Sequence, residues 1–296
     1  DFYPSAALLY LAAILRANDY EPIIIDLNNA VVHSQKEKYL DYCKKIIIDS
    51  LNEHKPDFVG INCLFSGNFP DVLEFATTIK SHSPNLKIVI GGIHPTTFYR
   101  EILTNCNNID YVAIGEGENT IIALAASIKA KNENLLNSIH SFAYRDKDGM
   151  IKINRKKNYV KDLNSLPMPA WDLININKFE MNLDHYYNPP KLPVKFKAAI
   201  FSSRACPLSC NFCDMFLVMG KKHRKRSVKT IVDEIEFLHK SYGVNYFSFM
   251  DDNLTLNRAH IMDLCNEMIR RKLRIIWDTP SGLWINSLRE EVVAKM

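Results

Sequence analysis

The sequence predicts an α/β protein built from two regions in which strands and helices alternate. Three observations lead to this fold class. Apolar runs of strand length recur along the chain, the segments between them repeat apolar residues every three or four positions, and a proline-containing stretch separates the two regions. Because such alternation is typical of a parallel sheet with helices on both faces, we expect the first region to be a doubly wound, Rossmann-like domain.

Four apolar runs in the first region have the length and composition of buried parallel strands. They are Pro22–Leu27, Asp57–Leu64, Lys87–Gly92 and Asp110–Gly115. Segments with helical spacing lie among them. One contains Leu8, Leu11, Ala12 and Leu15, a second contains Val72, Phe75, Ala76 and Ile79, and a third covers residues 120–129.

The carboxyl ends of three of these strands carry glycines. Ligands of open α/β sheets bind at those ends, and glycine allows a positive φ and a close approach of the backbone to a ligand. One such turn is ordinary turn chemistry, whereas three on successive strands favour a ligand site. The candidate residues are Leu64, Phe65, Ser66, Gly67, Gly91, Gly92, His94, Pro95, Gly115, Glu116, Gly117 and Glu118.

A hairpin and a linker follow the first region. Ser141–Val160 has a hairpin turn at Asp148–Gly149, and the next stretch contains Pro167 and Pro169. The second region then alternates again. Its expected strands are Ala198–Ser203, Asn245–Met250 and Arg274–Thr279, and its expected helices are Val228–Tyr242, capped by Ser227 and Gly243, Arg258–Lys272 and one that begins near Ser287.

Composition and charge exclude several classes of protein. The chain has 296 residues, 47% hydrophobic and 24% charged, and a net charge of +4, which together describe a globular protein without the charge of a diffuse nucleic-acid binder. The basic stretch Gly220–Ser227 lacks interleaved aromatic residues, so a solvated loop or arginines beside a bound carboxylate are favoured over a phosphate-binding patch. No apolar run approaches the roughly 18 residues of a membrane span, so no membrane partner is expected.

Three of the seven cysteines fall within eight positions and form the pattern C-x3-C-x2-C. The odd total, without the spacing of a disulfide framework, indicates a reducing cytoplasmic setting. A structural zinc site needs a fourth ligand, which His223 could supply. On a four-iron cluster, three thiolates leave one iron open for a substrate or cosubstrate, which accounts for the odd number.

At this motif the sequence resembles the radical S-adenosylmethionine superfamily, whose signature is C-x3-C-x-aromatic-C. The resemblance implies that Cys206, Cys210 and Cys213 ligate a 4Fe–4S cluster whose open iron binds S-adenosylmethionine, with Phe212 near the adenine. The family's contact to the methionine amino group would fall on Met250, Asp251 and Asp252, whose two carboxylates suit an ammonium group. A capping or solvated turn is the ordinary alternative for either aspartate.

The first region resembles the N-terminal cobalamin-binding domain of cobalamin-dependent radical S-adenosylmethionine enzymes. The resemblance is carried by GGIHPTT, AIGEGENT and the linker LPMPAWDL. It implies a cobalamin domain over residues 1–140, a hairpin and linker over 141–195, and the first half of a (βα) barrel over 196–296, with further barrel units outside the chain. The D-x-H-x-x-G loop that supplies a cobalt ligand in many cobalamin proteins is absent from this sequence, and His94 is interpreted as a contact to the nucleotide tail or the backbone.

The function implied by this resemblance is methyl transfer to an unactivated carbon through a 5′-deoxyadenosyl radical and methylcobalamin. The implied partners are a small-molecule or peptide-derived substrate and an electron donor of the flavodoxin or ferredoxin type. The close alternative is a mutase, cyclase or oxidative enzyme of the same architecture. A methylthiotransferase acting on transfer RNA is disfavoured because Cys43, Cys63 and Cys106 are scattered, and a cobalamin-binding module without catalysis is the non-enzyme alternative.

Overall fold

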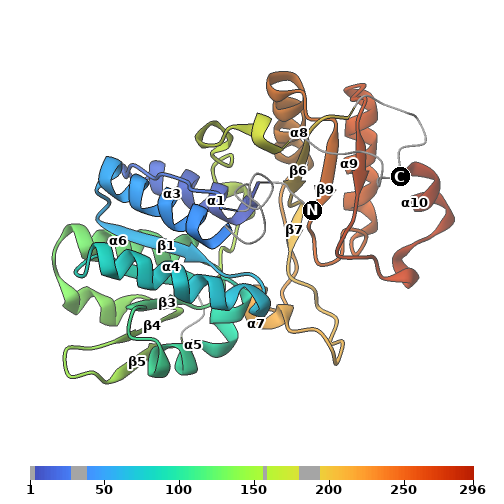
Figure 1. Ribbon diagram of the computed structural model, residues 1–296. Coiled ribbons are helices and arrows are strands. Elements are labelled where there is room, and N and C mark those ends of the chain that lie inside the picture. Colours follow the sequence, from blue (N-terminus) through green and yellow to red (C-terminus); the bar gives the residue numbers. More distant parts are fainter. Residues whose placement is uncertain (1–3, 28–38, 156–158, 180–193) are drawn as a thin grey trace. The chain divides into compact units, whose positions relative to one another are not determined.

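The computed structural model describes residues 4–27, 39–155, 159–179 and 194–296 (Figure 1). The chain forms two compact units. Unit 2 comprises Ile14–Val160 and Asp214–Gly220, and unit 1 comprises Asp1–Ala13, Lys161–Cys213 and Lys221–Met296. The first helix, α1 (Ala6–Arg16), spans the point at which the chain passes from unit 1 to unit 2.

Unit 2 contains a five-stranded sheet in the order β1-β2-β3-β4-β5 (Figure 1). The first three strands are parallel, and the last two form the antiparallel hairpin that the sequence predicts. The strands are β1 (Phe58–Asn62), β2 (Lys87–Gly91), β3 (Tyr111–Ala113), β4 (Phe142–Arg145) and β5 (Ile151–Asn154). The helices of unit 2 after α1 are α3 (Tyr39–His54), α4 (Phe69–His82), α5 (Ile93–Asn105), α6 (Glu118–Lys129) and α7 (Met215–Met219).

The core of unit 2 joins helices α3, α4 and α5 to one face of this sheet. Alternate residues of β2 point toward it, because successive side chains of a strand face opposite ways. Its buried members include Cys43, Ile47, Val72, Phe75, Ala76, Ile79, Ile88, Ile90, Ile102, Leu103 and Val112. The α4 stripe predicted from the sequence is therefore confirmed, and Cys43 and Cys63 are buried in this apolar cluster.

Two parts of the first region differ from the sequence prediction. Pro22–Leu27 is not a strand: its residues alternate between more and less exposed, with Ile23 and Ile25 on the exposed side, but form no ladder. Alternation indicates only an extended backbone, whereas a strand also needs a hydrogen-bonded neighbour. The GGIHPTT turn is short, because α5 begins at Ile93 and already includes His94 and Pro95.

Unit 1 contains a three-stranded parallel sheet in the order β10-β9-β6, with helices α8 and α9 beside it (Figure 1). Its strands are β6 (Lys197–Ile200), β9 (Tyr246–Phe249) and β10 (Ile276–Asp278), with a small antiparallel pair, β7 (Ser203–Arg204) and β8 (Arg224–Lys225). Its helices are α8 (Val228–Tyr242), α9 (Arg258–Arg270) and α10 (Glu290–Lys295). The linker consists of the 3-10 turns η4 (Leu163–Ser165), η5 (Trp171–Leu173) and η6 (Ile176–Phe179).

Helix α8 shows how the local sequence sets an element. The Ser227 hydroxyl accepts a hydrogen bond from the Thr230 amide at 3.2 Å, which satisfies one of the free amides at the start of the helix. At the other end Gly243 takes a left-handed conformation with φ 69°, which glycine adopts without steric cost. The buried side chains Ile231, Ile235 and Leu238 form the stripe that faces the core. Both caps predicted from the sequence are confirmed. Helical spacing also predicts a buried stripe of Val228, Ile231, Ile235, Leu238 and Tyr242, of which the three central residues are buried and the two at the ends only partly so.

Candidate functional site

The cysteine loop follows β6 and β7 in unit 1, beyond the carboxyl end of a parallel strand. Cys206 and Cys213 are partly buried and Cys210 is exposed, and the Cys213 amide donates a hydrogen bond to the Cys210 carbonyl at 3.1 Å. The Phe212 side chain is 93% exposed. All seven cysteines are free thiols. The loop thus presents its sulfur atoms and an aromatic ring without using any of them in the packing of the core.

The three thiols lie within electrostatic range of one another. Burial raises the pKa of Cys206, and the nearby Asp252, Cys210 and Cys213 raise it further. Among the described residues, no three His, Cys, Asp or Glu side chains converge as ligands of one metal ion, and His223 keeps a buried Nε2 atom without a hydrogen-bond partner. A four-iron cluster does not require such convergence, because each thiolate binds a different iron. Three thiols on one exposed loop therefore fit a cluster.

Strand β9 ends at two adjacent aspartates that have different surroundings. Asp251 is 2% exposed, and both of its oxygens accept hydrogen bonds from Ser202 and Ser203. Asp252 accepts a hydrogen bond from the Ala205 backbone, but its Oδ2 atom is buried and has no partner among the residues that the structure describes. Burial raises the pKa of Asp252, and the neighbouring Asp251 adds to this shift. A buried carboxylate oxygen without a partner costs free energy unless a cationic or donor group meets it, so Asp252 fits an ammonium ligand.

The predicted cobalamin residues of unit 2 lie after β1, β2 and β3, three neighbouring parallel strands. After β1, the side chains of Leu64 and Phe65 are 42% and 64% exposed. Exposed apolar side chains gathered at a strand edge are typical of binding surfaces. Together with the small residues Ser66 and Gly67, they leave a partly apolar edge that fits a large planar ligand.

His94 is held at this edge by specific contacts. Its Nδ1 atom lies 2.9 Å from the Ser66 hydroxyl, and its ring centroid lies 4.4 Å from that of Phe69 and 4.9 Å from that of Phe98. Burial lowers the pKa of His94, which favours the neutral ring. These contacts fix the ring between two aromatic side chains and tie the first turn of α5 to the segment after β1.

Gly92 and Gly115 are positions where only glycine fits the turn. Gly92 has φ 113°, and a Cβ atom there would lie 2.4 Å from the Cys63 carbonyl oxygen. Gly115 has φ 80°, and a Cβ atom there would lie 3.1 Å from the Val218 carbonyl oxygen of α7. Both turns therefore depend on the missing side chain for packing, whatever ligand they contact.

Three other predicted cobalamin contacts are turned into the fold. Pro95, Glu116 and Glu118 are buried. The Glu116 Oε2 atom accepts a hydrogen bond from the Val160 amide at 2.7 Å, which fixes the end of the hairpin region to the turn after β3. The carboxylate of Glu116 therefore has a structural partner already.

A polar cluster on the sheet of unit 1 was not predicted from the sequence. Asp278 accepts hydrogen bonds from Tyr246 at 3.0 Å and from Ser248, and it forms an ion pair with Lys197 at 3.4 Å. The Lys197 side chain is 1% exposed. The four residues come from three strands and share one face, so only the strand register joins them. The signal in the sequence was a lysine at the head of an otherwise apolar strand.

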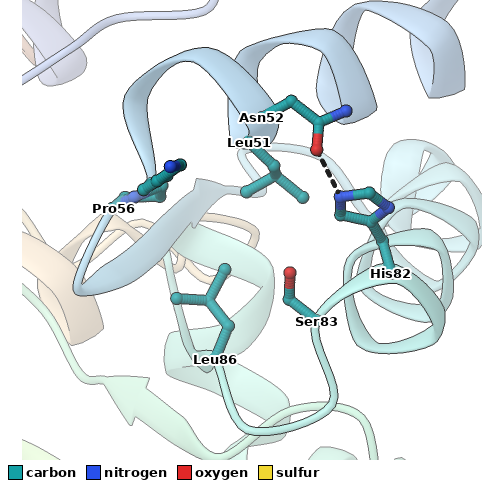
Figure 2. A pocket seen from close by; sticks show the side chains of 7 residues that line it. Leu51, Asn52, Pro56, His82, Ser83 and Leu86 are labelled. Atoms are coloured by element: carbon teal, nitrogen blue, oxygen red, sulfur yellow. Dashed lines mark hydrogen bonds between the residues drawn. The ribbon is translucent and has the colours of Figure 1, made fainter.

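A pocket of about 280 Å³ in unit 2 lies away from these residues. Figure 2 shows Leu51 and Asn52 of α3 and His82 of α4 around it, with a hydrogen bond of 2.9 Å between Asn52 and His82. It is lined by the final turns of these helices and by Leu86, which precedes β2. The pocket therefore lies toward the amino ends of the strands, opposite the predicted ligand edge.

Comparison with known families and structures agrees with this arrangement. Residues 2–125 match the B12 binding domain and residues 200–296 match the radical SAM superfamily. The chain is 27% identical to the cytidylyl-2-hydroxyethylphosphonate methyltransferase of Streptomyces wedmorensis, over 99% of this chain and 59% of that protein. It is 31% identical to the anaerobic magnesium-protoporphyrin IX monomethyl ester cyclase of Synechocystis, over 77% of this chain and 43% of that protein.

Solved structures of two enzymes share the fold. The cobalamin-dependent S-adenosylmethionine radical enzyme OxsB superposes with a TM-score of 0.71 at 20% identity, covering 93% of this chain and 36% of OxsB. The methyltransferase TsrM from Kitasatospora setae, solved with cobalamin and a [4Fe-4S] cluster, superposes with a TM-score of 0.66 at 19% identity, covering 90% of this chain and 48% of TsrM. The chain spans about half the length of the curated relatives it matches.

A B12-binding α/β region followed by a radical SAM region defines the class of this protein. The cofactors that name these two families are cobalamin for the first region and S-adenosylmethionine for the second. The chain therefore combines a B12 binding domain with a region of the radical SAM superfamily. Among the residues with a described conformation, no helix is long and apolar enough to cross a bilayer.

Proposed function

We propose that the protein is a cobalamin-dependent radical S-adenosylmethionine methyltransferase that acts on an unactivated carbon. The observation that carries the proposal is the pairing, in unit 1, of a three-thiol loop with a buried acceptor at Asp252 that has no partner of its own. Two relatives named as methyltransferases align over 99% of the chain, which supports methyl transfer over other outcomes.

In this proposal each residue has one task. Cys206, Cys210 and Cys213 hold the cluster, and the free Oδ2 atom of Asp252 accepts a hydrogen bond from the ammonium group of S-adenosylmethionine. The exposed ring of Phe212 is available for stacking on the adenine. When bound, the cluster, S-adenosylmethionine and cobalamin supply one-electron chemistry and a transferable methyl group, and the protein supplies their positions.

The cobalamin contacts belong to the same proposal. The backbone of the turns at Gly67, Gly91, Gly92, Gly115 and Gly117 can approach the corrin or its nucleotide tail closely. Leu64 and Phe65 offer apolar contacts to cobalamin. His94, whose ring is held by Ser66, contacts the nucleotide tail of cobalamin or the protein backbone and is not a ligand of the cobalt. Of the twelve candidate residues, the buried Pro95, Glu116 and Glu118 shape the turns from inside.

A second function is favoured by a specific observation. The relative with 31% identity is named as a cyclase, and its match extends over 77% of the chain. A radical cyclase or another oxidative enzyme would use the same thiol loop and Asp252 without methyl transfer. Formation of 5′-deoxyadenosine without a methylated product would favour this second function.

The partners and location follow from the chemistry. We propose a small-molecule or peptide-derived substrate and a flavodoxin or ferredoxin as the one-electron donor. Free thiols at all seven cysteines suit the reducing cytoplasm, where such donors work.

The test is a metal count on the full chain. The protein is reconstituted anaerobically with iron, sulfide and hydroxocobalamin and then desalted, beside a Cys206→Ala/Cys210→Ala/Cys213→Ala variant. About four irons and one cobalt per chain, with only the iron lost in the variant, would support two separate cofactor sites. Iron without cobalt would remove methyl transfer through cobalamin, and zinc in place of iron would overturn the radical mechanism.

A further inference from the structure

The segment before the first cluster cysteine carries unusual backbone strain. Ala205, next to Cys206, has φ 71° and is 2% exposed. A left-handed conformation is unfavourable for a residue with a Cβ atom, because that atom then crowds the following carbonyl oxygen. Such strain persists only where surrounding contacts determine the conformation. Those contacts must therefore come from groups around residues 202–205.

One carboxylate, Asp251, supplies the contacts to residues 202 and 203, and the neighbouring Asp252 accepts a hydrogen bond from the Ala205 backbone. Asp251 Oδ2 accepts a hydrogen bond from the Ser202 amide at 3.0 Å, and Oδ1 accepts from the Ser202 hydroxyl at 2.6 Å and the Ser203 hydroxyl at 2.5 Å. Asp251, Ser202 and Ser203 are all at most 3% exposed. A single side chain at the end of β9 therefore joins two consecutive residues that lead into the cysteine loop.

The strands on either side hold the same segment in register. The Met250 amide donates to the Ile200 carbonyl at 2.8 Å, so the pairing of β9 with β6 continues up to the residue before Asp251. The Arg226 amide donates to the Ser202 carbonyl at 2.9 Å. Backbone hydrogen bonds thus hold the chain at Ile200 and Ser202, and the Asp251 carboxylate holds the turn at Ser202 and Ser203 that leads into the cysteine loop.

From these contacts we infer that Asp251 is a positioning residue for the cluster loop, whereas Asp252 is the aspartate that meets S-adenosylmethionine. The assignment rests on the proposed function. It gives different roles to two adjacent carboxylates that the sequence alone could not distinguish. Asp251 has both oxygens engaged by serine donors, whereas Asp252 keeps one buried oxygen without a partner. In this assignment Asp251 does not touch the cofactors and positions the loop through Ser202 and Ser203, which lead to the strained Ala205.

The first readout needs no cofactor. In Asp251→Asn the side chain keeps its size, but an amide NH2 replaces one acceptor and meets donors. We expect backbone hydrogen exchange of residues 200–206 in the cluster-free full chain to rise about ten- to a hundredfold, as for loss of a hydrogen bond to a charged group. Asp252→Asn is the matched control, because its remaining carbonyl oxygen can still accept from the Ala205 amide.

The second readout is the electron paramagnetic resonance signal of the reduced, reconstituted chain. Asp251→Asn and Ser202→Ala/Ser203→Ala should alter the signal in the same way before S-adenosylmethionine is added, and combining them should add nothing further. Asp252→Asn should weaken the response of the signal to S-adenosylmethionine at least tenfold, which the Asp251 and serine variants should not do. If Asp251→Asn fails to fold, the serine variant, which keeps the carboxylate, carries the comparison.

Two results would overturn the assignment. One is an Asp251→Asn chain with ordinary exchange and an ordinary signal but weakened binding of S-adenosylmethionine, which would make Asp251 a direct contact. The other is additive effects of the Asp251 and serine substitutions, which would show that they act separately. If the unaltered chain takes up no iron, the proposed function fails, and the exchange readout still tests the role of Asp251.

Discussion

Replacing Glu234 with glutamine tests the most deeply buried ion pair of unit 1. The Glu234 carboxylate lies 2.6 Å from the Arg226 guanidinium, and the two side chains are 1% and 8% exposed. Glu234 also accepts a hydrogen bond from the Trp171 indole of the linker at 3.3 Å. Glutamine keeps the size and an acceptor for Trp171 but removes the charge. The Arg226 charge then remains buried without its ion-pair partner, with only the weaker electrostatic influence of Asp251.

The expected cost follows from that buried charge. Breaking a buried pair by removing one partner destabilises proteins by about 3–5 kcal/mol, and we expect Glu234→Gln to lose an amount in this range. Arg226 keeps its other hydrogen bonds, to the Tyr10 hydroxyl and the Phe201 carbonyl, both at 3.0 Å, and to the Thr230 carbonyl at 3.2 Å, which limits the loss but does not neutralise the charge.

The assay is urea unfolding at pH 7 followed by tryptophan fluorescence, to which Trp171 contributes a signal beside the pair. Lys229→Ala is the control, because that ammonium lies on the same helix and is 80% exposed, so the midpoint should not move. The double variant Arg226→Met/Glu234→Leu should be no less stable than Glu234→Gln alone. A loss below about 1 kcal/mol in Glu234→Gln would refute the reasoning.

Three further changes have directions set by the structure. Gly92→Ala should lower the free energy of unfolding of unit 2 by at least about 2 kcal/mol, measured by urea unfolding. The cause is a strained φ together with a clash between the new Cβ atom and the Cys63 carbonyl. Ala205→Gly should stabilise unit 1 by up to about 1 kcal/mol in the same assay, because relief of left-handed strain exceeds the entropy that glycine adds to the unfolded chain. For His260, whose pKa burial lowers to about 4, the unfolding free energy should fall as pH drops from 6.5 toward 4, measured by unfolding across that range.

The controls for these changes also come from the structure. Gly67→Ala should be tolerated, because a Cβ atom there meets nothing within 4 Å. Between pH 6.5 and about 4, His260 binds a proton in the unfolded state but not in the folded state. The contribution of neutral His260 to the free energy of unfolding is therefore complete above pH 6.5 and is lost progressively as the pH falls toward 4. Lys225 and His223 lower the pKa further and Asp263 raises it. His260→Gln should flatten the pH profile, and an unchanged profile would contradict the assignment.

Much of the fold and the cluster motif could be predicted from the sequence, because both depend on short spacings. Each of these features is set by residues close together in the sequence. They are the cysteine spacing, the apolar runs of β1, β2 and β3, and the caps of α8 at Ser227 and Gly243. Local hydrogen bonds and side-chain periodicity act at that range. The two-region architecture was therefore determined by the sequence alone, and the cluster chemistry of the three thiols stays a prediction from the same kind of short spacing.

Only the tertiary structure decided which polar or extended segments find hydrogen-bond partners within the fold and which do not. Asp251 and Asp252 look alike in the sequence, and only contact with Ser202 and Ser203, nearly 50 residues away, separates them. Pro22–Leu27 has the pattern of a strand but no paired neighbour. Whether a polar group is satisfied depends on partners that only folding brings within about 3 Å, and no local pattern records where those partners will be.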